Sequence, residues 1–339
     1  MFRDSLNIAS HLNWRRVMNL FHLRYSYFMA KHFQRIKSSG LPYAASIEPT
    51  TACNLGCPEC PSGLKKFTRP TGKLDINYHE TLLDGLGKQL FYINYYFQGE
   101  PFIHPQFLDL IKAAKSRKIY TATSTNAHFI QTPEKAEAIV QSGLDRLIIS
   151  IDGLTQATYE QYRVNGDLKK VIKGTELLVA AKKKLKSSTP HLIFQFLVVR
   201  PNEHEIPDVL ALGKKMGVDE VRLKTAQLYD YENGNPLMPT QEKYARYRKT
   251  KSGKYVPKYK LLDQCWRMWS STVLTWDGKV VPCCFDKDAQ HVLGSIEKKS
   301  DFEKIWNNPT YQNFRKAVFT DRSSIDICKN CSEGTKVWT

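Results

Sequence analysis

The stretch Cys53-Asn54-Leu55-Gly56-Cys57-Pro58-Glu59-Cys60 places three cysteines in one short loop, directly after a strand-like run at 44–49. Three thiolates in one loop can converge on one inorganic centre. A structural zinc site takes four protein ligands, and a fully protein-ligated iron–sulfur cube takes four cysteines. Three cysteines therefore leave one metal position open to another molecule. Two alternatives stay open, namely a zinc site completed by a distant fourth ligand and three unrelated thiols.

The spacing Cys53-x-x-x-Cys57-x-x-Cys60 resembles the signature of the radical SAM superfamily. The resemblance implies that these cysteines hold a [4Fe–4S] cluster and that S-adenosylmethionine (SAM) binds its fourth iron. It also implies reductive cleavage of SAM to a 5′-deoxyadenosyl radical, which takes a hydrogen atom from the substrate. The cofactor does the difficult chemistry in such enzymes, and the protein supplies orientation. Glu59 departs from the family, which usually has an apolar or aromatic residue there, near the adenine.

Strand and helix patterns alternate from residue 44 to about residue 224. The expected strands are 44–49, 92–98, 120–124, 146–151, 192–199 and 220–223, and the expected helices are 78–90, 106–117, 133–142, 167–185 and 205–216. Strands joined by crossover helices predict a parallel α/β sheet. Six units are too few for a closed eight-stranded barrel, and the resemblance implies an open, partial (β/α)6 TIM-type barrel. Chemistry in such barrels lies in the loops after the strands.

Three of these loops carry candidate SAM-binding residues. Gln98-Gly99-Glu100-Pro101 resembles the Gly-Gly-Glu-Pro motif of the family, with Gln98 replacing the first glycine. By that resemblance Glu100 accepts a hydrogen bond from the SAM ammonium. Ser150 and Arg163 would contact the SAM carboxylate, which a guanidinium binds in a bidentate manner. Asn126 would lie near the ribose or the substrate.

A second cysteine set occupies the C-terminal part of the chain, where Thr275-Trp276-Asp277-Gly278 predicts a hairpin joining 271–274 to 279–281. Adjacent strand residues point to opposite faces, so Cys283 and Cys284 are not expected to serve one cluster together. The step from Gly278 to Cys283 resembles the SPASM extension of radical SAM enzymes in its shortened "twitch" form.

That second resemblance, which also covers 294–309, implies one auxiliary [4Fe–4S] cluster. Its ligands would be Cys265, Cys283, Cys328 and Cys331. Zinc in a site of four cysteines is the alternative, and Cys284 would be a buried thiol or a spare ligand.

The N-terminal segment predicts one amphipathic helix over 11–37. Its apolar stripe repeats at steps of three and four residues and comprises Trp14, Val17, Met18, Phe21, Tyr25, Phe28, Met29, Phe33 and Ile36. We favour packing of this stripe on the barrel, with binding to an anionic membrane interface as the alternative. The expected domains are 1–42 (helical segment), 43–228 (barrel), 229–262 (linker) and 263–339 (auxiliary-cluster domain). Within the linker, 243–260 either covers the barrel mouth or is exposed.

Composition limits the compartment and the partners. The chain has 339 residues, eight cysteines and a net charge of +17. We expect neither a membrane span nor a secretory signal, and cysteines in such a chain indicate metal ligation in a reducing compartment. The expected protein is cytoplasmic, with membrane association as an option. The charge suits an acidic macromolecule or an anionic membrane, and no nucleic-acid-binding motif is present.

The predicted function is net oxidative modification of a peptide or protein. An external donor such as flavodoxin or ferredoxin would supply the electron for SAM cleavage. A base would assist the oxidation, and Asp152 and Asp230 are the candidates; Asp152 could instead orient the substrate or cap the following helix. The alternatives are oxidation of a small carbohydrate-derived or lipid-linked metabolite and a non-catalytic iron–sulfur protein that transfers electrons.

Overall fold

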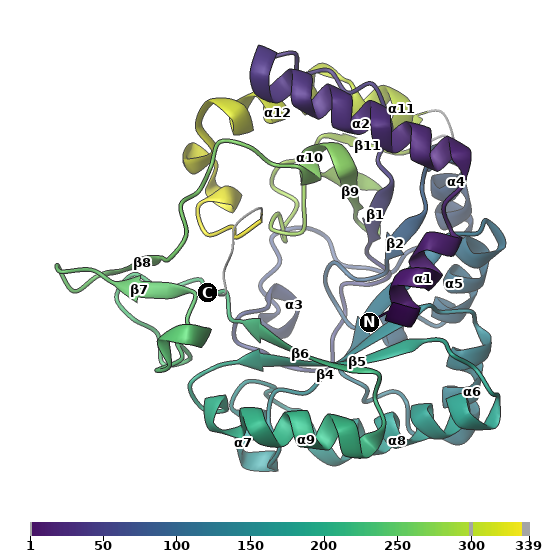
Figure 1. Ribbon diagram of the computed structural model, residues 1–339, viewed down its shortest axis with the longest axis vertical. Helices are drawn as coiled ribbons and strands as arrows, with labels where there is room; N and C mark the ends of the chain where they lie inside the picture. Colours follow the sequence, from purple (N-terminus) through teal and green to yellow (C-terminus); the bar gives the residue numbers. More distant parts are fainter. Residues whose placement is uncertain (1, 298–300, 334–339) are drawn as a thin grey trace.

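The computed structural model describes residues 2–297 and 301–333. Its main sheet has nine strands in the order β11-β10-β9-β1-β2-β3-β4-β5-β6 (Figure 1). Neighbouring strands from β1 to β6 pair in parallel. Their bounds confirm all six predicted strands: β1 (Ala44–Ile47), β2 (Tyr92–Asn94), β3 (Tyr120–Thr125), β4 (Arg146–Ser150), β5 (His191–Val198) and β6 (Glu220–Thr225). Because β6 and β11 are the two edges, the barrel is open, as predicted.

The five predicted crossover helices are confirmed to within a few residues: α4 (Ile76–Leu86), α5 (Phe107–Ser116), α6 (Pro133–Gln141), α8 (Leu168–Lys184) and α9 (Ile206–Met216). Side-chain caps set where several of them begin. Asp75 caps α4, Thr132 caps α6 and Asp167 caps α8, each by accepting a backbone N–H of the first turn. The pattern did not predict the short helices α3 (Pro61–Leu64), η1 (Pro101–Ile103), α7 (Gln156–Glu160) and η2 (Glu203–Glu205).

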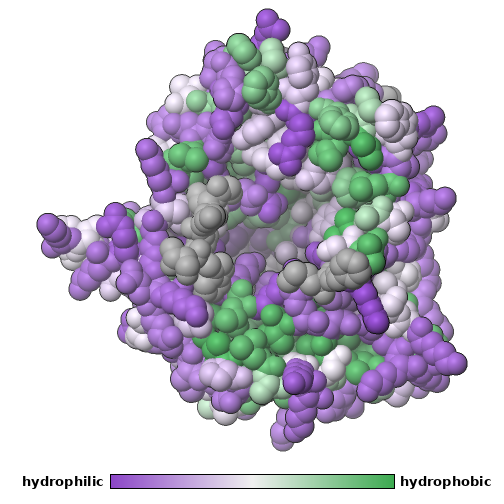
Figure 2. Space-filling model, in the orientation of Figure 1, coloured by the Kyte–Doolittle hydropathy of each residue, from purple (hydrophilic) through white to green (hydrophobic). Residues whose placement is uncertain are grey.

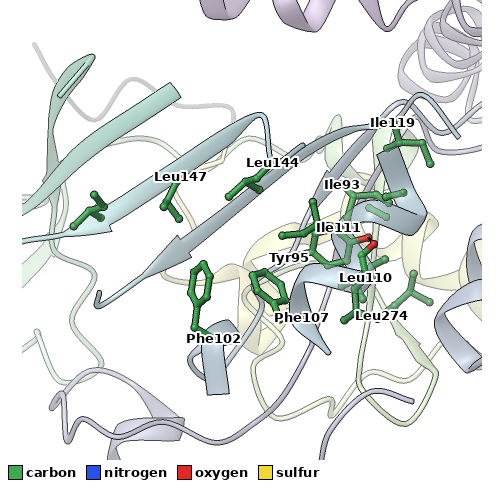
Figure 3. Close-up of a cluster of buried hydrophobic side chains, with 14 of the residues drawn as sticks. Ile93, Tyr95, Phe102, Phe107, Leu110, Ile111, Ile119, Leu144, Leu147 and Leu274 are labelled. Carbon is green, nitrogen blue, oxygen red and sulfur yellow. Dashed lines mark hydrogen bonds between the residues drawn. The ribbon is translucent and has the colours of Figure 1, made fainter. Parts of the chain in front are cut away.

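A buried core between the sheet and helices α4 and α5 positions the loop that follows β2 (Figure 3). The Tyr95 hydroxyl donates to the Leu110 carbonyl over 3.1 Å and lies 2.7 Å from Nε2 of His79. The rings of Phe102 and Phe107 meet edge to face, with their centroids 5.0 Å apart. Tyr95 therefore fixes both helices to the chain just before the 98–101 loop.

The N-terminal segment differs from its prediction. It forms two helices, α1 (Phe2–Ser10) and α2 (Trp14–Phe33), and Asn13 caps the second by accepting the Arg16 N–H at 3.0 Å. Helix α2 does pack on the barrel, but through the face opposite to the predicted stripe. Trp14, Phe21, Tyr25, Phe28 and Phe33 are exposed, whereas the buried residues are Arg16, Asn19, Leu23, Ser26 and Ala30. No helix within the described ranges is long and apolar enough to cross a membrane.

The segment after β6 forms an antiparallel hairpin of two short strands, β7 (Tyr247–Lys249) and β8 (Tyr255–Pro257), preceded by η3 (Glu242–Tyr244). The rings of Tyr231 and Tyr247 stack with centroids 4.4 Å apart. The Tyr247 hydroxyl accepts the Leu228 N–H at 3.0 Å. This tyrosine-rich stretch is thus attached to the chain that leaves the barrel.

The predicted C-terminal hairpin is confirmed as β9 (Ser271–Leu274) and β10 (Lys279–Val281), which pair antiparallel. Strand β9 also pairs in parallel with β1, from Ala44 opposite Ser271 to Ile47 opposite Leu274. The hairpin therefore extends the barrel sheet, which the sequence pattern did not predict. The remaining elements are α10 (Arg267–Ser270), β11 (Gly294–Ser295), α11 (Asp301–Trp306), α12 (Pro309–Asp321), η4 (Arg322–Ser324) and η5 (Asp326–Cys328).

Candidate functional site

The first cysteine loop leaves the C-terminal end of β1, where a barrel of this type carries its chemistry. Its backbone is fixed by the Gly56 N–H, which donates to the Val164 carbonyl at 2.8 Å. Burial, together with the neighbouring charges of Glu100 and the other thiols, raises the pKa of Cys53 to about 12. Bound iron stabilises the thiolate form that such burial disfavours, so this donor set fits an iron centre.

The loop after β2 crosses directly over the cysteine loop at Gly99. Gly99 has φ +76°, and a Cβ at this position would lie 2.1 Å from the Thr50 carbonyl oxygen, so only glycine fits. The Glu100 N–H donates to the Ala52 carbonyl at 2.8 Å. Gln98, the departure from the family motif, lies with its Oε1 3.9 Å from Cys60 Sγ. Its side chain therefore faces the cysteines.

Glu100 is buried, and its carboxylate organises the end of β3. Oε2 accepts the Asn126 N–H at 2.7 Å, and Oε1 accepts the Thr125 hydroxyl at 2.9 Å. Burial raises the pKa of Glu100 to about 7, although these hydrogen bonds oppose the shift. Nδ2 of Asn126 donates to Oδ1 of Asn54 at 2.8 Å, which joins β3 to the cysteine loop. Sequence reasoning missed Asn54, whose only signal is its place between two cysteines.

Arg163 and Asp152 form a buried pair against the same loop. Asp152 accepts Nε of Arg163 through Oδ2 at 2.5 Å and the Leu197 N–H through Oδ1 at 2.7 Å. Nη1 of Arg163 donates to Cys57 Sγ at 3.7 Å. Burial alone would lower the pKa of Arg163, but the charges of Asp152 and Cys57 hold it well above its usual range.

Two further predictions concern the end of β4 and the helix after it. The expectation that Asp152 caps that helix is wrong, because Thr155 caps α7 by accepting the Thr158 N–H at 3.1 Å. Ser150 is the last residue of β4 and is buried. Its hydroxyl makes no hydrogen bond with the residues of 2–297 or 301–333, so it can still bind a ligand.

Glu59 joins the cysteine loop to the chain after the barrel. Its Oε2 accepts the Tyr229 N–H at 2.8 Å. Nζ of Lys287, from the auxiliary region, lies 2.7 Å from Oη of Tyr229 and 3.5 Å from the Glu59 carbonyl oxygen. This attachment gives Glu59 a structural role in place of the apolar residue that the family usually has. Asp230 follows in the chain and is exposed.

The second cysteine set surrounds a buried arginine. Nη2 of Arg322 donates to Cys331 Sγ at 3.1 Å, and its Nη1 donates to the Gln264 carbonyl at 2.9 Å. Burial, together with the charges of Cys265 and Cys328, raises the pKa of Cys331 to about 11, although the charge of Arg322 opposes the shift. Sequence reasoning missed Arg322, because nothing in its local sequence distinguishes it from other arginines.

The adjacent thiols of Cys283 and Cys284 have different surroundings. Burial raises the pKa of Cys283, as do the charges of Cys284, Cys265 and Cys331. Cys284 instead packs against the apolar cluster of Phe97, Val273 and Val281. Cys283 thus lies near two of the other three predicted auxiliary ligands, Cys265 and Cys331. All eight cysteines are free thiols.

The surface beside the first loop is hollowed. A cavity of about 510 Å³ is lined by Thr51, Cys53, Ser62, Lys65 and Lys73, among others. Figure 2 shows a depression at the centre of the same view, within the ring of elements seen in Figure 1. Within the described residues, no three His, Cys, Asp or Glu side chains are arranged to hold a single metal ion.

Two family models match the chain: the radical SAM superfamily over residues 47–220 and the iron–sulfur cluster-binding SPASM domain over residues 265–332. The PqqA peptide cyclase of Gluconobacter oxydans is 24% identical over 315 residues, which cover 88% of this chain and 84% of that protein.

A second relative is the tungsten-containing aldehyde ferredoxin oxidoreductase cofactor-modifying protein of Pyrococcus furiosus. It is 24% identical over 318 residues, which cover 84% of this chain and 86% of that protein. Among solved structures, Streptococcus suis SuiB bound to S-adenosylmethionine has the same fold, with a TM-score of 0.61 and 14% identity over 92% of this chain and 76% of SuiB.

Proposed function

The chain belongs to the radical SAM superfamily, and on that basis we propose that it oxidises a peptide or protein substrate. It is a radical SAM enzyme with a SPASM domain, and its cofactors are SAM and iron–sulfur clusters. When bound, the first cluster supplies the electron that cleaves SAM to the radical that abstracts hydrogen. The observation that carries the proposal is the second cysteine set, in which Cys265, Cys328 and Cys331 lie around Arg322 and Cys283 lies near Cys265 and Cys331. Four protein ligands leave no position for substrate, so this set suits an acceptor of the substrate's electron.

The residues of the first site divide the work of binding SAM. Cys53, Cys57 and Cys60 would hold the cluster, and Glu100, whose Oε2 accepts the Asn126 N–H, would accept a hydrogen bond from the SAM ammonium. Arg163 keeps its second terminal nitrogen available for the SAM carboxylate, with Ser150 as a further donor.

Three more roles complete this assignment. Asn126 lies beside the loop, where the ribose or the substrate would bind. Both oxygens of Asp152 are engaged, so we expect it to position Arg163. A role for Asp152 or the exposed Asp230 as base stays a prediction.

Peptides are the favoured substrate class. The relatives include a PqqA peptide cyclase and a mycofactocin maturase, MftC, of Mycobacterium ulcerans. A net charge of +17 attracts acidic chains, and it equally suits an acidic external donor such as flavodoxin or ferredoxin. A small carbohydrate-derived or lipid-linked metabolite is the second candidate, because the relative from Pyrococcus furiosus is named for modifying a cofactor.

The roles of the two cysteine sets are tested with the anaerobically reconstituted enzyme, dithionite and SAM. Cys57→Ala should abolish the formation of 5′-deoxyadenosine, because it removes a ligand of the first cluster. Cys328→Ala should retain SAM cleavage but lose the oxidised product. The opposite pattern would overturn the assignment of the two sets.

The substrate class is tested with pooled synthetic peptides that differ in charge. Acidic peptides should stimulate 5′-deoxyadenosine formation and emerge with a mass lower by about 2 Da, the loss of two hydrogens. Stimulation by aminocyclitols or other carbohydrate-derived alcohols, with all peptides unchanged, would replace the peptide proposal with the metabolite one.

A further inference from the structure

Helix α2 buries polar side chains beside the apolar residues Leu23 and Ala30, and it exposes aromatic rings. Its inward face carries Arg16, Asn19 and Ser26, all buried. Arg16 donates to the His11 carbonyl and, at 2.7 Å, to the Lys118 carbonyl. Asn19 and the backbone of Leu41 exchange two hydrogen bonds, of 2.7 and 2.9 Å. Polar contacts with the backbone therefore attach this helix to the barrel.

The outward face of α2 is aromatic. Trp14 is 74% exposed, Phe21 63%, Tyr25 62% and Phe28 51%. These four residues, which we call the aromatic face, are spaced seven, four and three residues apart, so they form one stripe along the helix. In Figure 2 hydrophobic side chains are visible at the surface in the region that α2 occupies in Figure 1. Aromatic rings so exposed mark a surface that binds something.

Within α2 and the segment that follows it only positive charge flanks the aromatic face, although the exposed Glu303 of α11 lines a cavity together with Trp14 and Arg15. Residues 14–37 contain no aspartate or glutamate but include Arg15, Arg16, Arg24, Lys31, Arg35 and Lys37. Arg15, Arg24 and Lys31 are exposed. A symmetric contact between two copies of this face would bring like charges together, so a second copy of the chain fits poorly.

A basic cavity adjoins the aromatic face at the N-terminal end of α2. It has a volume of about 760 Å³ and is lined by Trp14, Arg15, Lys88, Arg117 and Lys118, among others. Its only acidic lining residue, Asp84, is paired with Arg117 at 3.1 Å. Arg15, Lys88 and Lys118 are exposed and free of ion pairs with the described residues. Such a cavity suits a phosphate group next to a partly immersed indole.

We propose that the aromatic face of α2 binds the surface of an anionic lipid bilayer. Exposed aromatic rings between basic side chains are the composition of a helix that lies in the plane of a membrane interface. Arg16 contacts carbonyls just before β2 and β3, so this end of α2 lies at the N-terminal ends of the strands. The first cysteine loop follows the C-terminal end of β1, at the opposite end of that strand, so lipid bound at this end of α2 leaves the first loop accessible.

The test is flotation of the reconstituted, full-length enzyme with vesicles. Wild-type protein should float with phosphatidylcholine vesicles that contain phosphatidylglycerol and not with pure phosphatidylcholine. F21S/F28S should bind at least tenfold more weakly. R15Q/K31Q should bind roughly 25-fold more weakly, at about fivefold for each basic residue near an anionic surface.

The matched controls lie on α9, at the other end of the molecule from α2 in Figure 1. Leu210 is also an exposed hydrophobic residue, 46% accessible, so Leu210→Ser should leave binding within twofold of wild type. K214Q/K215Q, which removes two exposed charges from the same helix, should do the same. SAM cleavage in solution should be unchanged in all variants, which shows that each is folded.

Three results would overturn the proposal. They are equal binding to neutral and anionic vesicles, undiminished binding by F21S/F28S, and a lipid-free dimer that F21S/F28S converts to monomer in sedimentation velocity. The third result would assign the aromatic face to self-association. None of the three bears on SAM cleavage, so the proposed function is tested separately.

Discussion

Arg322→Met should lower the reduction potential of the auxiliary cluster. The guanidinium is buried, and Nη2 lies 3.1 Å from Cys331 Sγ. At a separation of about 5 Å and an effective dielectric constant of about 20, one positive charge stabilises one added electron by about 3 kcal/mol. That energy corresponds to roughly 140 mV for a one-electron couple. Charge and hydrogen bonds at the sulfurs are known determinants of such potentials.

The measurement is an EPR-monitored redox titration of the reconstituted enzyme, with iron content checked for each variant. Lys316→Met is the matched control, because it removes the same charge from the exposed surface of α12, where water screens it. Arg322→Lys keeps the charge and should shift the potential by less than half as much as Arg322→Met. A shift below about 20 mV in Arg322→Met with both clusters loaded, or an equal shift in Lys316→Met, would refute the reasoning.

Three further predictions concern the barrel. Gly99→Ala would place a Cβ 2.1 Å from the Thr50 carbonyl oxygen. The enzyme should therefore lose about half of its iron, and it should lose SAM binding as measured by equilibrium dialysis. Retention of both the iron and SAM binding would contradict the close crossing of the two loops. Asp152→Asn leaves buried Arg163 without its counter-charge and should lower the free energy of unfolding by about 3–5 kcal/mol. The control Asp109→Asn, which removes an exposed pair with Lys112, should lower it by about 0–1 kcal/mol. Equal losses in thermal unfolding would contradict the buried pair. Burial lowers the pKa of His79 to about 3, so as the pH falls from 7.5 to 5 the His79 side chain takes up a proton only in the unfolded chain. Over this range the wild type should therefore lose about 2 kcal/mol of stability relative to His79→Phe. A constant difference between wild type and His79→Phe over this pH range would show that His79 titrates normally.

Local patterns predicted the strands and crossover helices because each is bounded by signals in its own sequence, such as the capping residues Asp75, Thr132 and Asp167. The orientation of α2 was mispredicted for a physical reason. Periodicity assumes that an aromatic stripe faces inward, whereas the inner face here includes Arg16, which donates a hydrogen bond to the Lys118 carbonyl, a partner 102 residues away.

The candidate site likewise combines residues that local motifs predict with residues whose partners are known only from the folded chain. Cys57 and Glu100 lie in short motifs, so the sequence alone predicts roles for them. Asn54 and Arg322 belong to common residue types, and only the folded chain places one against Asn126 and the other against Cys331. The pairing of Asp152 with Arg163 was likewise invisible, because each had been assigned a separate partner.

The parallel pairing of β9 with β1 has a consequence for the integrity of the molecule. If the chain were cut after residue 262, the backbone N–H and C=O groups along one side of β1 would lose their partners. An unprotected strand edge is a template for aggregation. Adjacent strands also lie about 4.8 Å apart, so the distance between the two cysteine-bearing halves is fixed by a ladder of hydrogen bonds and not by a flexible tether. Neither half is therefore expected to survive expression alone, and the spacing between the redox centres is a property of one continuous sheet.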